Sequence, residues 1–529
     1  MRRPLRIAAV AAVVLVPLVG GGFLVQERGI RDGARLLDQV LDLVSERYVD
    51  TVGTAALYEH AAKGLVKELN DPYSELLTPK QLSRFTQNTN GRYGGIGMQI
   101  EPQEGSVVVS RVFPNTPAEQ AGVREGDRIV QIDTTTTRGW TTSQVSEVLT
   151  GTPGTKVTVK FQRPGSAEFT ARLTRAIIRV PAVHYAIMLD GGIGYIPLIQ
   201  FNETAAAELE RQVRRLQKEG ARSFILDLRD NPGGILEQAL TISNFFLPQG
   251  EEVLSVRGRG VPSQTLVADD RPIIPAAPLV VLVDGGSASA SEIVAGALQD
   301  HDRALVVGTT SFGKGLVQTL FTLEGGYALK ITTAKWYTPS GRSIQRERKF
   351  VDGRFVEDEP DSLETDSARK ARPAYKSDAG RTVYGGGAIT PDVIVPEDTI
   401  STAEQTLAKV LAAKSQIVYT TLSDYALELK PSLTPSFTLQ PAWREELYRR
   451  LQRAGVQVDR ATWDAGASYI DRALDQRISR LAFGDSTAKR RFLPYDAPLR
   501  RAVELLRKGQ TQRDLFTVAA ASPPRRPER

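Results

Sequence analysis

The sequence predicts a multidomain protein built around an α/β domain, and three patterns support this prediction. Between residues 191 and 306, short apolar runs rich in β-branched residues alternate with helical patterns, which is typical of a mainly parallel sheet with functional sites at the carboxyl ends of its strands. Residues 98–174 contain several short β-branched runs, which indicate a small β-rich domain. Residues 34–90 and 401–508 have helical periodicity. A chain of 529 residues is too long for one hydrophobic core and fits three or four domains.

The first residues have the composition of a membrane signal anchor. Arg2, Arg3 and Arg6 precede the uncharged stretch from Ile7 to Val25, which is just long enough to span a bilayer. No clear Ala-x-Ala cleavage site follows, so we expect residues 1–26 to remain as an anchor in the cell (inner) membrane. Because positive residues stay on the cytoplasmic side, the rest of the chain is expected on the periplasmic or extracytoplasmic side.

The composition excludes several kinds of site. The chain has no cysteine, which excludes a thiol nucleophile, disulfides and a cysteine-based zinc site. Its net charge is +6, but the basic residues are dispersed, and no basic stripe with interleaved aromatic residues suggests nucleic-acid binding. The chain has three histidines, and we expect no metal site and no cofactor.

A candidate nucleophile follows the most apolar predicted strand, Leu279 to Val283. Two glycines come next, and a helical pattern then runs from Ser289 to Leu298. A sharp turn from strand to helix leaves the first helical side chain free and points unpaired N–H groups outward, which suits a developing oxyanion. However, Ser289 and Glu292 also have the spacing of a capping box, so this stretch alone favours a helix cap as much as a nucleophile.

A candidate general base lies downstream, in the glycine-rich segment from Gly308 to Gln318. Lys314 stands between two glycines, where it can be desolvated, and burial lowers the pKa of a lysine by disfavouring its charged form. A neutral amine could then act as a base, as in known Ser–Lys variants of the catalytic triad. Gln318 lies four residues on and could orient the amine. His301 is the only histidine close in sequence to Ser289, and it is the weaker candidate base.

These motifs resemble a known family. The run Ser-Ala-Ser-Ala-Ser-Glu centred on Ser289, followed after 25 residues by Lys314 in Gly-Lys-Gly-x-Val-Gln, is similar to the carboxy-terminal processing peptidases, or tail-specific proteases. The match extends from about Ala34 to Asp398. The resemblance implies a crotonase/Clp-protease-like core in which Ser289 is the nucleophile, Lys314 the base and Gln318 the residue that positions the lysine.

The same resemblance implies an oxyanion hole. One donor would be the N–H of Ala290, after the nucleophile, and the other would come from an Asn-Pro-Gly-Gly turn at either Gly233 or Gly234. Asp300 matches an acidic position in the family, for which we expect a structural role at a helix end rather than a chemical one.

The β-rich region, residues 91–179, resembles a PDZ domain of the protease-associated type. The motif that carries this resemblance runs from Pro117-Ala118 to Gly126-Asp127-Arg128. A PDZ domain adds an extended peptide to a sheet edge and holds its C-terminal carboxylate in a glycine-rich loop. By resemblance, the loop residues are Gly94, Gly95, Ile96, Gly97 and Met98, with Ile96 and Gly97 as N–H donors.

Two features qualify the PDZ interpretation. The loop glycines could instead be turn residues of a small β-fold, although we favour the PDZ interpretation. Thr150 also stands where the family usually has an arginine. If that arginine couples PDZ occupancy to the active site, Thr150 cannot, so we favour a PDZ domain that tethers substrate over one that activates the enzyme.

The remaining segments complete the predicted organisation. The N-terminal helical segment covers residues 30–90, and the resemblance implies that it could pack between subunits of a homo-oligomer. Core packing alone also explains its apolar stripe, and we favour that role. The peptidase core covers 180–398 and includes a charged surface insertion at 346–384. Residues 399–518 are expected to form a helical domain for packing or association, and residues 519–529 a disordered tail.

The predicted function is that of a membrane-anchored serine endopeptidase with a Ser–Lys dyad. Its expected substrates are proteins or peptides with apolar C-terminal tails. One alternative is a P-loop-like nucleotide-binding protein, because Gly308-x4-Gly313-Lys314 follows a strand, but Gly315 replaces the Ser or Thr that must reach Mg²⁺. A non-catalytic PDZ scaffold is the other alternative, weakened because Ser289, Lys314 and Gln318 are all present.

Overall fold

The structure is a computed structural model that describes residues 33–103, 106–163, 166–347, 349–351, 354–356, 370–398 and 400–521. The predicted anchor, residues 1–26, lies outside this range. Within the described residues, no helix has the length and apolar character needed to cross a membrane. The chain divides into two compact units, one of residues 1–80 with 318–332 and the other of residues 81–317 with 333–529.

The smaller unit joins N-terminal helices to part of a β-sheet. A helix over residues 33–47 and α2 (Thr54–Lys67) precede β1 (Glu75–Leu77), which pairs antiparallel with residues 328–330. The turn between α2 and β1 is stabilised by Asp71, whose carboxylate accepts from Ser74 Oγ at 2.5 Å. The apolar stripe of the first helix does not form a core in the described residues, because Leu36, Leu37, Val40 and Leu43 are all exposed.

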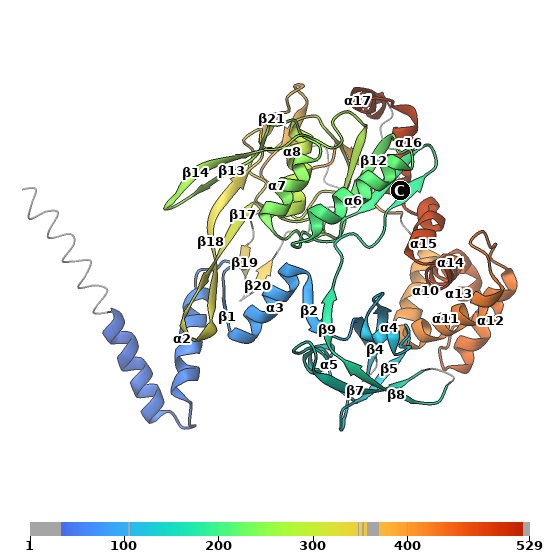
Figure 1. Cartoon of the computed structure of the whole chain (residues 1–529), viewed down its shortest axis with the longest axis horizontal. Coiled ribbons are helices and arrows are strands. Elements are labelled where there is room, and N and C mark those ends of the chain that lie inside the picture. The colour runs from blue at the N-terminus through green and yellow to red at the C-terminus, as the bar shows by residue number, and fades with distance from the viewer. Residues whose placement is uncertain are drawn as a thin grey trace, which may run out of the picture. The chain divides into compact units, whose positions relative to one another are not determined.

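The larger unit is built on a six-stranded sheet (Figure 1). Its strands, in spatial order, are β10 (Ile187–Leu189), β11 (Ile193–Pro197), β12 (Ser223–Asp227), β15 (Leu279–Val283), β16 (Leu305–Gly308) and β23 (Val393–Ile394). All neighbours are parallel except β10 and β11. Three helices connect the strands, α6 (Ala205–Lys218), α7 (Leu236–Asn244) and α8 (Ala290–Asp300). The mainly parallel sheet predicted from the alternating pattern is confirmed.

Each face of this sheet is covered by different helices, because successive strand residues point to opposite faces. Val281 and Val283 join the cluster formed with α6, α7 and α8. Val280 and Leu282 lie on the other face, where they join Leu499 of α16 (Ala497–Lys508) and residues of α17 (Gln512–Ala521). The last two helices of the described chain therefore complete the core of the peptidase sheet.

The region predicted as one helical domain, residues 399–518, divides into two packing groups. Helices α10 to α14 share a core of their own around Leu407, Leu451 and Trp463. These helices are α10 (Thr402–Ala412), α11 (Ser415–Leu429), α12 (Pro441–Arg453), α13 (Arg460–Ala465) and α14 (Ala467–Phe483). Helices α16 and α17 pack on the sheet instead. Because α17 reaches Ala521, the first three residues of the predicted disordered tail are helical, and the rest of that tail lies outside the described residues.

The predicted β-rich domain has the expected strands and helices. Its strands, in spatial order, are β3 (Met98–Gln103), β4 (Ser106–Val112), β5 (Arg128–Ile132), β7 (Lys156–Gln162) and β8 (Phe169–Thr174), with the short strand β6 (Thr135–Thr136) beside β5. Helices α4 (Pro117–Gln120) and α5 (Thr142–Leu149) lie between them in sequence. Among the described strands β3 pairs only with β4, so its other edge is open to an added strand.

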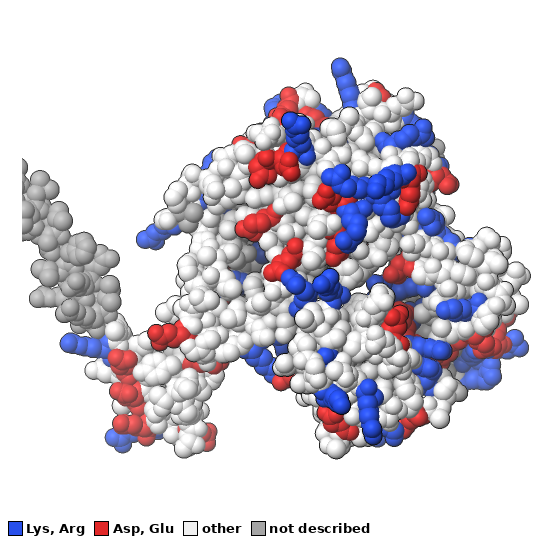
Figure 2. All heavy atoms as spheres, viewed as in Figure 1, with Lys and Arg blue, Asp and Glu red and all other residues white. Residues whose placement is uncertain are grey.

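The predicted insertion, residues 346–384, contains two hairpins. Strands β19 (Lys349–Val351) and β20 (Arg354–Val356) form the first, and β21 (Ala374–Lys376) and β22 (Thr382–Tyr384) form the second. Arg381 pairs with Asp302 and Asp392, so the second hairpin is bound to the peptidase core. On the face shown in Figure 2, basic and acidic side chains are interspersed.

Candidate active site

The turn between β15 and α8 is held by a single carboxylate. Oδ1 of Asp284 accepts from the N–H groups of Gly286 at 2.9 Å and Ser287 at 3.1 Å. It also accepts from the N–H of Asp230 at 3.0 Å, on the turn after β12. Ser287 Oγ donates to the carbonyl of Leu228 at 2.8 Å. The ends of two neighbouring strands are thereby fixed together.

Ser289 has a strained backbone. Its φ of 54° and ψ of −113° lie in a region that a residue with a Cβ rarely adopts, at a cost of about 1–3 kcal/mol. Ser289 is the N-cap of α8, its side chain is half-buried, and its N–H donates to Glu292 Oε2 at 2.9 Å. Strain of this kind is typical of a nucleophile at a sharp turn from strand to helix. Ser289 is therefore the helix cap that the sequence allows, and its role as nucleophile stays a prediction.

Glu292 connects the serine turn to the lysine segment. Its carboxylate is fully buried and accepts from Ser311 Oγ at 2.5 Å and from the N–H of Gly313 at 2.7 Å. Oε2 accepts from the N–H of Lys314 at 2.9 Å, and the N–H of Ser289 is equally far from that atom. Because the amide nitrogens of Ser289 and Lys314 both lie 2.9 Å from this oxygen, they are less than twice 2.9 Å from each other. Burial raises the pKa of Glu292, and these donors oppose the shift by stabilising the carboxylate.

The segment around Lys314 is fixed from its other side as well. Trp336 is buried, its Nε1–H donates to the carbonyl of Lys314 at 3.2 Å, and its backbone N–H donates to Gly315 at 3.0 Å. The N–H of Gly315 donates to Gln345 Oε1 at 2.9 Å. Because both peptide groups beside Lys314 are bonded, the start of its half-buried side chain is held in place.

The Asn-Pro-Gly-Gly turn lies directly against the serine. A Cβ built on Gly233 would be 2.9 Å from the Cβ of Ser289 and 2.8 Å from the nitrogen of Ala290, so only glycine fits there. The N–H of Gly233 donates to Asn231 Oδ1 at 2.9 Å. The N–H groups of Gly234 and Ala290 donate no hydrogen bond to any residue within the described ranges.

Three other residues that the sequence analysis singled out have contacts of their own. Gln318 belongs to the smaller unit, where its amide donates to Thr332 Oγ1 at 3.4 Å. His301 follows the last residue of α8 whereas Ser289 precedes the first, and a helix of 11 residues is about 16 Å long, so the weaker alternative of a histidine base is wrong. Asp300 forms a buried ion pair with Arg342 at 2.7 Å, which is the structural role expected for it.

The PDZ loop has two unused donors. The carbonyls of Ile96 and Gly97 accept from Ala118 at 2.8 Å and Phe113 at 3.0 Å, but in the described part of the chain their own N–H groups donate to no residue. Gly97 has a φ of 88°, and a Cβ there would collide with Thr116. The loop therefore presents two N–H groups at the start of the open strand β3.

Position 150 is a threonine, and an arginine from another segment contacts the same end of α5. Thr150 ends α5, and its hydroxyl donates to the carbonyl of Ser146 at 2.8 Å. The guanidinium of Arg175 donates to the carbonyls of Val148 at 2.7 Å and Leu149 at 3.1 Å. Arg175 precedes β9 (Ala176–Arg179), which pairs with β2 (Arg92–Gly95) at the entrance to the domain. An arginine thus contacts the end of α5 from the exit strand instead of from position 150.

Sequence reasoning missed the residues that position the lysine. Glu292 was visible as half of a capping box, but its bonds to residues 311–314 require the fold. Trp336 and Gln345 lie in a segment that matched the family motif, but nothing in that motif says which carbonyl or amide they bind.

The chain is similar to known proteases. The family model described as Peptidase family S41 matches residues 192–352, a PDZ domain model matches residues 108–163, and the model of the Activating protease CtpB N-terminal domain matches residues 26–80. Carboxy-terminal processing protease CtpA of Bacillus subtilis is 32% identical over 64% of this chain and 73% of that protein. The Carboxy-terminal-processing protease of Bartonella bacilliformis is 38% identical over 58% and 71%. The solved photosystem II D1 C-terminal processing protease is 31% identical, covers 61% of this chain and 84% of its own, and has a TM-score of 0.35.

Proposed function

Because this chain belongs to the carboxy-terminal processing proteases of peptidase family S41, which are serine peptidases, we propose that it is an endopeptidase with a Ser289–Lys314 dyad. The observation that supports the dyad is the shared Glu292 carboxylate, which accepts from the amides of both residues. A buried acceptor of this kind fixes two loops 25 residues apart at one place.

In the proposed reaction, Ser289 Oγ attacks the scissile carbonyl carbon while the neutral amine of Lys314 takes the hydroxyl proton. The resulting ammonium then donates that proton to the leaving amine, and water repeats the sequence to hydrolyse the acyl-enzyme. Gln318 is proposed to orient the amine, on the strength of the family motif alone.

We place the oxyanion between the N–H groups of Gly234 and Ala290. Neither N–H group donates to any residue in the described part of the chain, whereas the N–H of Gly233 already donates to Asn231. The isolated parallel bridge between Phe201 and Gly234 uses the carbonyl of Gly233 and the N–H of Ile235, which leaves the Gly234 amide free to serve. Two preorganised donors of this kind contribute several kcal/mol to a transition state, at about 3 kcal/mol each.

We propose that the PDZ loop selects substrates by their C-terminal carboxylate. A peptide added to the open edge of β3 would place that carboxylate at the N–H groups of Ile96 and Gly97. An unstructured substrate with a small apolar C-terminal residue should be cleaved about ten times better, as kcat/KM, than the same substrate with an amidated tail, because amidation removes the charge that the loop binds. Steady-state kinetics with the two labelled peptides measures this ratio.

The control for tail recognition is a chain lacking residues 93–174, which should cleave both peptides equally. Adding a tail peptide in trans separates tethering from activation. With Thr150 in place of the family arginine, we expect the added peptide to compete. Several-fold stimulation would show activation instead, and equal cleavage of free and amidated tails by the intact chain would remove the PDZ role.

We propose that residues 1–26 anchor the chain and that the peptidase acts outside the cytoplasm. The support is the uncharged stretch from Ile7 to Val25 behind three arginines. A reporter fused after Arg529 should be active only in the extracytoplasmic compartment, and the protein should fractionate with membranes. A fusion after Asp398 is unsuitable, because α16 and α17 cover the peptidase sheet. Recovery of reporter activity in the cytoplasmic soluble fraction would contradict the proposal.

A homo-oligomer is also proposed, formed through the helix at residues 33–47. Its apolar side chains, including Leu36 and Leu43, are exposed in the single chain.

A further inference from the structure

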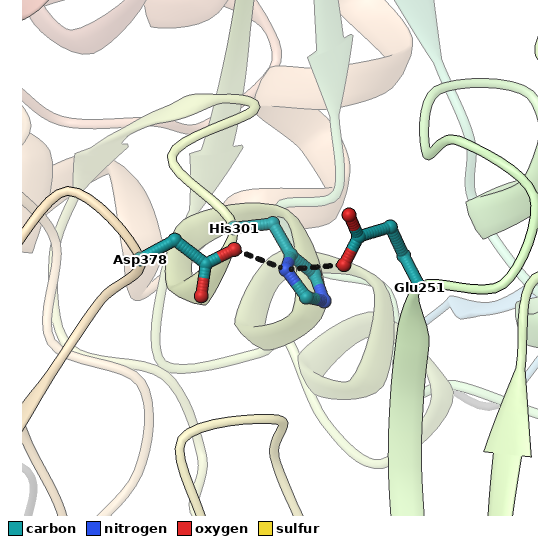
Figure 3. Close-up of side chains that lie close together, drawn as sticks. All are labelled: Glu251, His301 and Asp378. Carbon is teal, nitrogen blue, oxygen red and sulfur yellow. Dashed lines mark hydrogen bonds and ion pairs between the residues drawn. The ribbon is translucent and has the colours of Figure 1, made fainter.

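Three side chains of the kinds that bind divalent cations converge at the C-terminal end of α8. Glu251 lies just before β13 (Glu252–Gly258), His301 follows α8, and Asp378 lies in the turn between β21 and β22. Nδ1 of His301 is 2.7 Å from Oδ2 of Asp378 and 3.3 Å from Oε2 of Glu251 (Figure 3). One ligand atom from each residue lies within 4.8 Å of the other two. These three residues come from distant segments of the sequence, so no sequence motif predicted the cluster.

The tautomer of His301 is set by a backbone carbonyl. Nε2 lies 2.7 Å from the carbonyl oxygen of Glu252, which can only accept, so Nε2 carries a hydrogen. In the neutral ring, Nδ1 then presents a lone pair. A carbonyl that holds the far nitrogen in this way is the usual partner of a metal-binding histidine, because it fixes both the tautomer and the ring orientation.

In that tautomer, the lone pair of Nδ1 faces the carboxylate oxygens of Asp378 and Glu251. Three electron-rich atoms this close repel one another unless a cation lies among them. The site therefore favours positive charge, which a metal ion can supply among the three atoms or a proton can supply on Nδ1.

We propose that Glu251, His301 and Asp378 bind a divalent transition-metal ion, with Zn²⁺ as the best fit. One imidazole and two carboxylates suit zinc, whereas Ca²⁺ and Mg²⁺ prefer oxygen ligands alone. Ligands about 2.0 Å from a tetrahedral ion are roughly 3.3 Å apart, which the Glu251–His301 pair already satisfies. The shorter His301–Asp378 separation must lengthen, and the Asp378 side chain is 65% exposed and lies in a turn where it can move.

The site has access for the ion and for water ligands. It borders a cavity of about 240 Å³ that is also lined by Asp302, Arg303 and Gln512. Arg303 is the nearby cation, and its guanidinium donates to the carbonyls of Phe246 and Ile274.

The ion joins three segments of the peptidase core. The hairpin that carries Asp378 is already bonded to the end of α8, since the N–H of Asp378 donates to the carbonyl of Asp300 at 2.9 Å. Through Glu251, the ion also binds the turn before β13. The role is structural, because α8 separates the site from Ser289 by its full length, and the ion should raise stability without being needed for hydrolysis.

The test is a calorimetric titration of ZnCl₂ into the full-length, metal-free chain, purified without a histidine tag. The wild type should bind one Zn²⁺ per chain, and its melting temperature should rise by several degrees at saturation. His301→Gln should weaken binding about 100-fold or more, because the amide is a poor zinc ligand although it can still donate to Glu252. His184→Gln, which removes a half-buried histidine elsewhere, should bind like the wild type.

Two results overturn the proposal. The first is equal binding by the wild type and His301→Gln. The second is an absence of wild-type binding at about 100 μM Zn²⁺, in which case the cluster is only an ion pair of a protonated imidazole with two carboxylates. If His301→Gln does not fold, Asp378→Asn decides instead. Its side chain is exposed enough to keep the fold, and binding equal to that of the wild type would then overturn the proposal.

Discussion

Peptide hydrolysis by the Ser289→Ala and Lys314→Ala chains is expected to fall by about 10⁴-fold or more, because each change removes one partner of a unit that acts together. Lys314→Arg should be equally inactive, since a guanidinium does not deprotonate near neutral pH and cannot accept the hydroxyl proton. All three chains should remain folded, since both side chains are only half-buried. Hydrolysis of a fluorogenic peptide and circular dichroism check activity and fold together.

The matched control for the lysine is Lys330→Ala. Lys330 lies on β18 (Ala328–Tyr337), where it pairs with Glu75 at 3.3 Å, and its loss should leave kcat within about twofold, because such exposed pairs contribute little. Full activity of either alanine variant at Ser289 or Lys314 would refute the dyad. If Lys330→Ala inactivated the enzyme as strongly as Lys314→Ala, the effect of removing either lysine would be on the fold and not on the chemical step.

Glu292→Gln is expected to reduce kcat by about 100-fold and to lower stability by about 2–4 kcal/mol. The glutamine amide keeps one acceptor oxygen but turns its NH₂ group, which cannot accept, toward N–H donors. In the wild type, the Glu292 carboxylate accepts from Ser289, Ser311, Gly313 and Lys314. Because the amide cannot accept all of these bonds, the loops that carry Ser289 and Lys314 should shift relative to each other. KM should change less than kcat, since Glu292 is fully buried and cannot itself contact a substrate. Steady-state kinetics well below the melting temperature measures the split.

Glu404→Gln provides the control for that variant. Glu404 forms the same capping box with Ser401 at the start of α10, accepts from its N–H at 2.7 Å and is largely buried. Its replacement should lower stability while kcat stays unchanged. A Glu292→Gln chain that is destabilised but keeps the wild-type kcat would show that Glu292 only caps α8 and does not position Ser289 and Lys314.

Much of the fold follows from local patterns in the sequence. The run Leu279 to Val283 is apolar and β-branched throughout, and a strand buried on both faces has this composition. The helix after Ser289 and the strands of the PDZ domain follow from periodicity in the same way. The proposal that Ser289 acts with Lys314 also came from local motifs, because each lies in a short segment with its own glycines.

Contacts between distant segments could not be predicted. The amphipathic pattern of α16 indicates a helix with one apolar face, but it does not say whether that face packs on α14 or on a sheet formed 200 residues earlier. The reach of Glu292 to Lys314 depends on how β15 and β16 lie side by side. His301 was assessed as a base because it stands near Ser289 in sequence, whereas a helix carries residues 12 apart to opposite ends.

The place of α16 and α17 has a consequence for how the enzyme is made. Synthesis proceeds from the N-terminus at about 5–20 residues per second. By Ile394 the ribosome has delivered every strand of the sheet, together with Ser289 and Lys314. Leu499 and Leu515, which cover one face of that sheet, arrive roughly a hundred residues later. A growing chain thus spends several seconds with all strands of this sheet made while the face that α16 and α17 cover is still open.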